Sequence, residues 1–379
     1  MSNVRRLLGA AVLAACWATA SDTSAQIPVS LGESQGMPSL APLLKGVTPS
    51  VVSIAVRRRM TDEELAMMND PLLQHPLEPP VPPGDRNIYA AGSGVIIDAE
   101  QGLIVTGGHV VDGADEIVVI LTDGQRLTGS SVGSDAETDI AIVKVRAKNL
   151  IGVRMGDSDR LEVGDFVLSI GNPYSIGQTV TSGIVSAIRR RSWGDQGYED
   201  LIQTDAAINL GSSGGALVNL KGELVGMNSA ILDTGDPNGG NTGIGFAISV
   251  NTVRATANQI IKYGSASHGR LGAVVSSVKT DGAGASGVVI TRVPVESSAA
   301  RAGLKIGDII SALNASPIRD VADLQIKSAM FRVGDVVDLA IIRDGRPLTV
   351  RATLGARSQE KPLDGKSLGS LLRDGTATR

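Results

Sequence analysis

The sequence predicts a mainly β fold in which a pair of β-barrels is followed by a smaller α+β domain. From Val51 onward, short apolar runs such as 118–121 and 224–227 alternate with Gly, Asp and Asn turns. This spacing favours barrels over strands that alternate with helices. Residues 251–262 have the pattern of a helix, and the Gly- and Ser-rich stretch 263–269 that follows is typical of a linker. We therefore expect a domain boundary there.

Length and composition agree with several domains of ordinary globular protein. The chain has 379 residues, 42% of them hydrophobic but only 2% aromatic, so its cores must be built from Val, Ile, Leu and Ala. The net charge is −4 and no stripe of Lys and Arg is present, which argues against nucleic acid as a partner. Three scattered histidines and one cysteine do not form a usual zinc site, and we expect no metal or cofactor.

The N-terminus is typical of an export signal. Arg5 and Arg6 precede the apolar stretch 7–20, which is short for a membrane span of about 20 residues. Cleavage near residue 25 would leave residues 26–45 as an arm. The alternative is that the Leu-Ala-Ala-Cys run ending at Cys16 acts as a lipoprotein box, which would lipidate Cys16 and anchor the protein to a membrane.

A glycine-rich turn at Ser213 is the most informative local feature. Gly211, Gly214 and Gly215 allow the backbone to turn sharply, so that the hydroxyl is exposed and backbone N–H groups converge beside it. A nucleophile with an oxyanion hole needs this geometry. Taken alone, an ordinary Gly- and Ser-rich loop explains the same residues equally well.

Two residues upstream favour a catalytic role for Ser213 over an ordinary loop. His109 follows the strand-like run 102–105, and Asp139 begins the apolar run 140–145. The chain order His, Asp, Ser is that of the chymotrypsin-type barrel proteases and differs from the orders in α/β-hydrolases and subtilisin. In such a triad His109 accepts the Ser213 proton, and Asp139 orients His109 and stabilises the imidazolium. Singly, His109 fits a core histidine and Asp139 a turn residue.

The motifs around these residues resemble those of the HtrA/Deg family of bacterial envelope serine proteases. The resemblance covers residues 37–356 and is collinear. Its segments are 37–42, 49–54, 92–97, 109–114, 138–141, 171–173, 179–186, the Ser213 turn and 242–248. Two departures lie next to the serine, since Leu210 stands where the family usually has proline and Ser212 where it has asparagine. Neither departure removes a triad member.

The resemblance implies a chymotrypsin-like double β-barrel followed by a PDZ domain. The expected segments are a signal peptide at 1–25, an arm at 26–45, a protease domain at 46–262, a linker at 263–269, a PDZ domain at 270–356 and a disordered tail at 357–379. Residues 57–87 resemble the family's regulatory loop, although a disordered surface loop is an equal alternative. Residues 232–240 are expected to form a mobile loop beside the substrate pocket.

The resemblance also assigns binding residues in the protease domain. The oxyanion hole is expected at Gly211, Ser212 and Ser213, with the N–H groups of Gly211 and Ser213 as donors. The side chain before the scissile bond is expected to enter a pocket that has no acidic residue at its bottom. Such a pocket favours small or medium apolar residues. The pocket residues are Ala207, Ile208, Asn228, Ser229, Ala230 and Ile231.

In the second domain, the loop Arg270, Leu271, Gly272 and Ala273 matches the carboxylate-binding loop of HtrA-type PDZ domains. Its N–H groups would hold the C-terminal carboxylate of a peptide that joins the sheet as an extra strand. The segment 298–310 is the strongest PDZ signature, and 320–331 is expected to be the helix beside the peptide groove. His268 is interpreted as a linker residue rather than a ligand.

Together these observations predict a periplasmic or otherwise exported serine endopeptidase. Its expected partners are unfolded or damaged polypeptides and C-terminal peptides, and the resemblance implies a homotrimer. Two alternatives remain open at this point. One is a peptide-binding chaperone or scaffold with a silent protease domain, and the other is a regulatory protease that cuts one protein in envelope stress signalling.

Overall fold

The computed structural model describes residues 32–34, 37–63, 87–172, 177–190, 200–231, 243–278 and 287–356. Contacts divide the chain into two units, Met1–Leu44 and Lys45–Arg379. In the first unit, β1 (Gly32–Ser34) pairs antiparallel with β2 (Met37–Ser39). The helix α2 (Ala41–Val47) and a short 3-10 turn, η1 (Thr48–Ser50), precede the first barrel.

Several predicted segments lie wholly or mostly outside the described residues, and their predictions stay untested. These are the signal peptide at 1–25 with Cys16, most of the loop at 57–87, the loop at 232–240 and the tail at 357–379.

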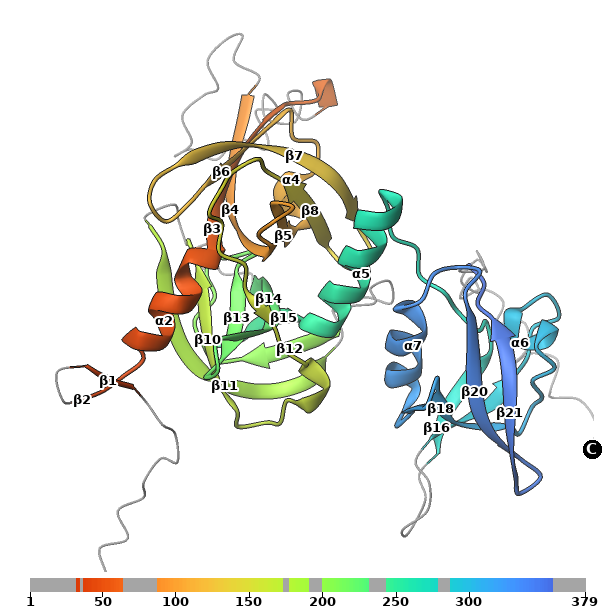
Figure 1. The fold of residues 1–379 in the computed structure, drawn as a ribbon. Coiled ribbons are helices and arrows are strands. Elements are labelled where there is room, and N and C mark those ends of the chain that lie inside the picture. The colour runs from red at the N-terminus through yellow and green to blue at the C-terminus, as the bar shows by residue number, and fades with distance from the viewer. Residues whose placement is uncertain are drawn as a thin grey trace, which may run out of the picture. The chain divides into compact units, whose positions relative to one another are not determined.

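The first domain of the second unit begins with a closed six-stranded barrel in the order β3-β4-β5-β8-β7-β6 (Figure 1). Its interior is filled by Val, Ile and Ala side chains, as the shortage of aromatic residues requires. The short helix α4 (Gly108–Val111) follows β5 directly. The strands are β3 (Val51–Arg59), β4 (Asn87–Asp98), β5 (Leu103–Gly107), β6 (Glu116–Ile120), β7 (Arg126–Asp135) and β8 (Ile140–Lys144).

A second sheet has the order β13-β10-β11-β12-β15-β14-β9, and an added β13–β14 pairing closes six of its strands into a ring. All pairings except β14–β9 are antiparallel. The predicted pair of barrels is therefore confirmed. The elements are β9 (Arg154–Met155), η2 (Ser158–Arg160), β10 (Phe166–Gly171), β11 (Thr179–Arg190), β12 (Leu201–Thr204), β13 (Ala216–Asn219), β14 (Glu223–Ile231) and β15 (Gly245–Ser249).

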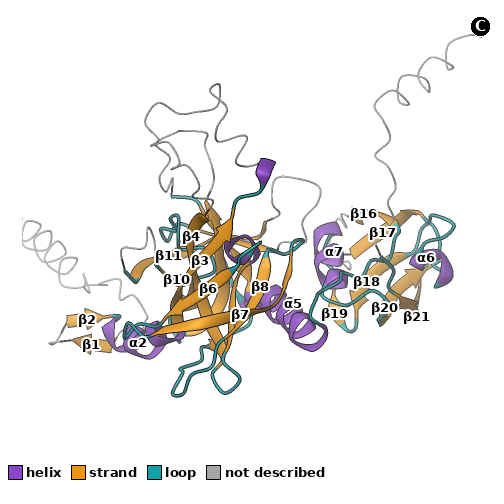
Figure 2. Cartoon of the chain, turned by 90° about the horizontal axis from the view of Figure 1, so that it is seen from above, coloured by secondary structure: helices purple, strands orange, loops and turns teal. Residues whose placement is uncertain are grey.

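The predicted helix after the barrels is α5 (Val250–Tyr263). It begins at Ser249, whose side chain accepts the N–H of Thr252, and it ends at Gly264, which has a φ of 78°. Its buried face packs on β7 and β8 of the first barrel and on β14 and β15 of the second. Figure 2 shows how few helices accompany the strands of the described chain.

The C-terminal domain is a small α+β unit with its own core of Leu, Ile and Val. Its sheet has the order β16-β17-β18-β20-β21, with β19 paired to β18. The predicted helix at 320–331 is α7, and the side chain of Asp320 caps it by accepting the N–H of Asp323. The elements are β16 (Val274–Val278), β17 (Gly287–Arg292), α6 (Ser298–Arg301), β18 (Ile309–Leu313), β19 (Ser316–Pro317), α7 (Val321–Ala329), β20 (Val336–Arg343) and β21 (Arg346–Thr353).

Candidate functional site

The first barrel supplies a bonded pair, His109 and Asp139. His109 lies in α4 just after β5, and Asp139 lies in the turn between β7 and β8. His109 Nδ1 is 2.7 Å from Asp139 Oδ2, and the His109 backbone N–H donates to Oδ1 at 2.9 Å. A third bond, from the Gly108 N–H to the Asp139 carbonyl at 2.9 Å, fixes the two segments together. The carboxylate therefore sets the orientation of the imidazole from two directions.

This pair sets the chemistry of the exposed imidazole nitrogen. The hydrogen bond that His109 donates to Asp139 raises the pKa of His109 above its usual value, although partial burial opposes the charged form. Because Nδ1 donates to Asp139, neutral His109 has its lone pair on Nε2. The His109 side chain is 53% exposed, so Nε2 is accessible to a reacting group. The arrangement is that of a general base held by a carboxylate.

Ser213 comes from the second barrel, in the turn between β12 and β13. Its hydroxyl donates to the carbonyl of Ser229 in β14 at 2.9 Å, and among the described residues it makes no hydrogen bond to His109. A rotation about the Cα–Cβ bond would release it from Ser229. Hydrogen bonds between a nucleophile and its base are often absent before substrate binds, so the geometry is compatible with a nucleophile at rest.

The backbone of the Ser213 turn presents two N–H groups that donate to no group the structure describes, those of Gly211 and Ser213. The N–H of Ser212 instead donates to the Asn209 carbonyl at 2.9 Å, so it is not free to hold an oxyanion here. Gly214 has a φ of 83°, and a Cβ there would collide with the carbonyl of Ser93. The tight turn therefore requires glycine at this position.

Ser93 in β4 holds this turn against the first barrel, a role that its Gly-Ser-Gly motif did not reveal. Its N–H donates to the Ser213 carbonyl at 2.8 Å, and its hydroxyl donates to the Gly211 carbonyl at 2.8 Å. The same hydroxyl accepts the N–H of Asn172 at 2.8 Å. Ser93 is completely buried. One side chain thus joins the turn that carries Ser213 to the barrel that carries His109.

Three of the predicted pocket residues, Ile208, Asn228 and Ala207, have contacts that the structure describes. Ile208 is buried and lies close to Gly245, where a Cβ would be 3.0 Å from the Ile208 side chain. Asn228 is also buried, and its backbone binds the Ser213 turn through bonds to Gly214 at 2.7 Å and Gly215 at 2.8 Å. Asn228 therefore supports the turn directly. The carbonyl of Ala207 accepts a hydrogen bond from the Thr181 hydroxyl at 2.8 Å. The structure does not describe the side chains of Ala230 and Ile231.

In the C-terminal domain, the 270–273 loop is anchored at its start. Arg270 and Gly355 exchange two backbone hydrogen bonds, at 2.8 and 2.9 Å. The carbonyl of Leu271 accepts the N–H of Ala299 at 2.8 Å, and Gly272 has a φ of 68°. The N–H groups of Leu271, Gly272 and Ala273 donate to no group that the structure describes. Such a row of N–H groups can receive a carboxylate.

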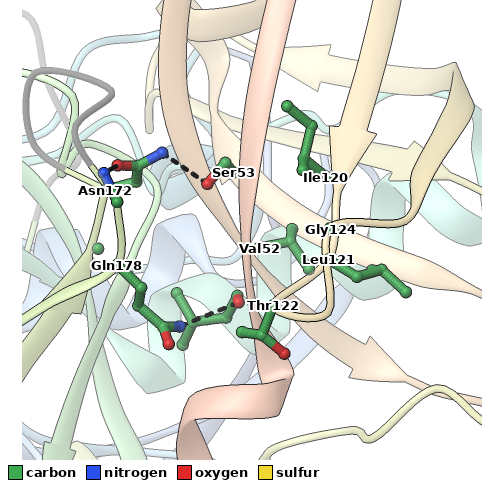
Figure 3. A pocket seen from close by; sticks show the side chains of 11 residues that line it. Val52, Ser53, Ile120, Leu121, Thr122, Gly124, Asn172 and Gln178 are labelled. Atoms are coloured by element: carbon green, nitrogen blue, oxygen red, sulfur yellow. Dashed lines mark hydrogen bonds between the residues drawn. The ribbon is translucent and has the colours of Figure 1, made fainter.

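A cavity of about 390 Å³ lies away from these residues (Figure 3). It is lined by β3, by the turn after β6 and by the segments on either side of residues 173–176. Asn172 donates to Ser53 across it at 2.7 Å, and Gln178 donates to the Thr48 carbonyl at 2.9 Å. His109, Asp139 and Ser213 do not line it. It is therefore separate from the candidate catalytic residues.

The described residues contain neither a cluster of metal-binding side chains nor a helix suited to crossing a membrane. No three side chains among His, Cys, Asp and Glu in this part of the chain gather closely enough to hold a metal ion. None of the helices in the described ranges combines the length and the apolar character that a membrane crossing requires.

Comparison with known proteins gives consistent matches over both domains. Residues 92–227 match the trypsin-like peptidase domain, and residues 269–354 match the PDZ domain. The chain is 42% identical to the periplasmic serine endoprotease DegP of Escherichia coli K12 over 372 residues, which covers 91% of this chain and 77% of DegP. It is 40% identical to the periplasmic pH-dependent serine endoprotease DegQ of the same strain over 343 residues, or 87% of this chain and 73% of DegQ.

Two solved structures of serine proteases are also similar to this chain. The HtrA-type protease AlgW with tripeptide has a TM-score of 0.63 and 36% identity, covering 86% of this chain and 99% of that one. The serine endoprotease from Yersinia pestis has a TM-score of 0.53 and 31% identity, covering 84% and 98%. With both domains matched in order and most of the length shared, the chain belongs to the HtrA/Deg family of bacterial envelope serine proteases.

Proposed function

We propose that the chain is a serine endopeptidase of the bacterial cell envelope in which Ser213, His109 and Asp139 form the catalytic triad. The observation that carries the proposal is the two-point hold of Asp139 on His109, with distances of 2.7 and 2.9 Å. The family membership supports the activity and the envelope location. The roles of the individual residues rest on their geometry.

The reaction would begin when substrate binding turns the Ser213 hydroxyl away from Ser229. As Oγ attacks the scissile carbonyl carbon, its proton passes to Nε2 of His109, and Asp139 stabilises the resulting imidazolium. The carbonyl oxygen becomes an oxyanion, which accepts the N–H groups of Gly211 and Ser213. The imidazolium then protonates the leaving amine. A water molecule, deprotonated by His109, releases the acyl group and restores the hydroxyl.

Recognition of substrate would use both domains. The 270–273 loop would bind C-terminal carboxylates through its N–H groups, with the peptide adding a strand beside β16. Ile208 would limit the depth of the pocket and favour small or medium apolar side chains before the cut bond. Unfolded or damaged polypeptides, which expose such residues, are the proposed substrates.

Assembly and membrane attachment belong to the same proposal. The resemblance to the HtrA/Deg family implies an oligomeric protease, and we propose that the oligomer is a homotrimer. Exported protein is proposed to be free in the periplasm, with lipid attachment at Cys16 as the alternative. The mass of the mature N-terminus and the native mass of the purified protein distinguish these possibilities.

The test of the catalytic role is casein cleavage by the wild-type chain and by Ser213→Ala. Loss of the nucleophile should reduce kcat by about 10⁶-fold. The matched control is Ser50→Ala, a buried serine whose hydroxyl donates to the Val47 carbonyl at 2.7 Å. If Ser213→Ala cleaves casein as fast as wild type, the assignment of Ser213 is wrong.

A chaperone with a silent protease domain is the second candidate, because the Ser213 hydroxyl bonds to Ser229 instead of His109. It predicts that wild type and Ser213→Ala suppress aggregation of an unfolded protein equally and that neither cleaves it. A regulatory protease would have the same catalytic residues. Comparing the envelope proteins of a deletion strain with those of its parent separates general degradation from the cutting of one protein.

A further inference from the structure

His268 lies between α5 and the C-terminal domain, where the sequence indicated an ordinary linker residue, yet its side chain is only 3% exposed. Its Nε2 is 2.8 Å from Oδ2 of Asp135, at the end of β7, and its Nδ1 is 2.8 Å from the carbonyl oxygen of Ala329, the last residue of α7. A backbone carbonyl only accepts hydrogen bonds, so Nδ1 carries a proton.

The contacts of Asp135 decide the state of the other nitrogen. Its Oδ2 also accepts the N–H of Thr138 at 3.0 Å and the Thr138 hydroxyl at 2.5 Å. Although burial opposes the charge, the hydrogen bonds from His268 and Thr138 lower the pKa of the Asp135 carboxyl, so it is ionised. Because Nδ1 is already a donor, a neutral His268 would turn the lone pair of Nε2 toward this carboxylate, so Nε2 carries a proton as well. His268 in this arrangement is therefore an imidazolium, paired with a buried carboxylate.

The remaining groups around His268 favour the same state. Burial opposes the charge, but the hydrogen bond and charge of Asp135, with the Ala329 carbonyl and the Glu137 carboxylate, raise the pKa of His268 above its usual value. The residues of α5, of α7 and of its C-cap that line the small cavity beside His268 are uncharged. They are Thr252, Ala255, Thr256, Ile326, Ala329 and Met330.

The turn held by this pair ends at Asp139. Asp135 bonds to both the N–H and the hydroxyl of Thr138, which immediately precedes Asp139. Asp139 has a φ of 52°, a left-handed conformation that a non-glycine residue keeps only when its surroundings hold it. The structure therefore connects His268 to the carboxylate beside His109 through one short turn.

We propose that Asp135 and His268 are positioning residues for the proteolytic reaction, and that their ion pair holds the 135–139 turn in the conformation that presents Asp139 to His109. The inference rests on the proposed roles of His109 and Asp139. Loss of the His268 proton leaves the Asp135 charge buried without its cation, and the turn relaxes. The activity should then fall as the pH rises through the pKa of His268. At acid pH, protonation of His109 lowers the activity.

The test compares kcat and KM for a peptide substrate from pH 5 to about 10 in wild type, His268→Gln and His268→Arg. His268→Gln should lower kcat about tenfold near the wild-type optimum, leave KM within about twofold and remove the alkaline limb. This loss is far smaller than the roughly 10⁴-fold loss expected when the triad aspartate itself is neutralised. His268→Arg keeps a permanent cation and should recover kcat at high pH. Asp308→Asn, which breaks a buried ion pair in the C-terminal domain, is the control for a purely structural loss and should keep the wild-type pH profile.

An alkaline limb that persists unchanged in His268→Gln overturns the inference. If that variant keeps the wild-type profile while Ser213→Ala is inactive, the proposed function stands and only the positioning role fails. A second measurement needs no variant to be active: the NMR titration of the three histidines in the folded chain, with His268→Gln used for assignment. The His268 resonance should titrate above the reference pKa of about 6.5, and titration below that value also overturns the inference.

Discussion

Replacing Ser93 with alanine removes a buried hydroxyl that bonds to two segments of the site at once. The Gly211 carbonyl loses its donor and the Asn172 N–H loses its acceptor, both at 2.8 Å in the native chain. Two lost hydrogen bonds amount to about 2 kcal/mol of unfolding free energy at roughly 1 kcal/mol each. The backbone bond from Ser93 to Ser213 does not depend on the side chain, so the turn should loosen rather than detach.

A looser Ser213 turn should also slow catalysis. Gly211 supplies one of the two proposed oxyanion donors, and complete loss of such a donor lowers kcat by about 10²- to 10³-fold. A shifted donor should cost less, so we expect kcat to fall roughly 10- to 100-fold with little change in KM. Urea unfolding gives the stability, and steady-state cleavage of a chromogenic peptide gives kcat and KM.

The matched control is Ser50→Ala. Ser50 is also completely buried and its hydroxyl donates to the Val47 carbonyl at 2.7 Å, but among the described residues neither one is hydrogen-bonded to the Ser213 turn. It should lose about 1 kcal/mol of stability and keep its kcat. If Ser93→Ala is destabilised but cleaves peptide at the wild-type rate, Ser93 stabilises the fold alone and the reasoning about the turn is refuted.

Three further predictions follow from single contacts. Because Asp139 raises the pKa of His109, kcat/KM should fall as the pH drops through a value above 6.5, and a pH–rate profile whose acid limb lies below 6 would contradict this. Gly214→Ala should abolish cleavage because its Cβ meets the Ser93 carbonyl, whereas Gly243→Ala, with open space around it and a similar positive φ, should remain active in the same peptide assay. Asp308→Asn should lower the midpoint of urea unfolding because Arg343 loses the charge of a partner that is 1% exposed. Arg343 lowers the pKa of Asp308, so this stabilisation is present above the carboxyl's ordinary value of 3.8 and is lost as the pH falls through the lowered value.

The fold was predictable because its signals are local or carried by collinear motifs. The alternation of short apolar runs with turns led to the barrels, and the 251–262 pattern led to α5 within a residue or two of its bounds. The chain order of His109, Asp139 and Ser213 suggested which residues meet. In the structure His109 and Asp139 are bonded, as that order predicts, and Ser213 lies in the predicted glycine turn.

The contacts that sequence could not supply join residues far apart in the chain. Ser93 and Gly211 are separated by 118 positions, and Asp135 and His268 by 133. Nothing in the residues near His268 distinguishes a buried imidazolium from a linker histidine, since its state depends on the carboxylate and carbonyl that folding places beside it. The same holds for the Ser213 hydroxyl, whose partner on β14 depends on the pairing of β13 with β14.

The division of the site between the barrels also makes the chain suitable for splitting into a two-part reporter. The first barrel carries His109 and Asp139, and the Ser213 turn, together with its partners Asn228 and Ser229, comes after β8. A break in the exposed segment between β8 and β9 would separate base from nucleophile, so neither fragment would contain a complete site. Fused to two interacting proteins, the fragments would turn the association of those proteins into peptide cleavage.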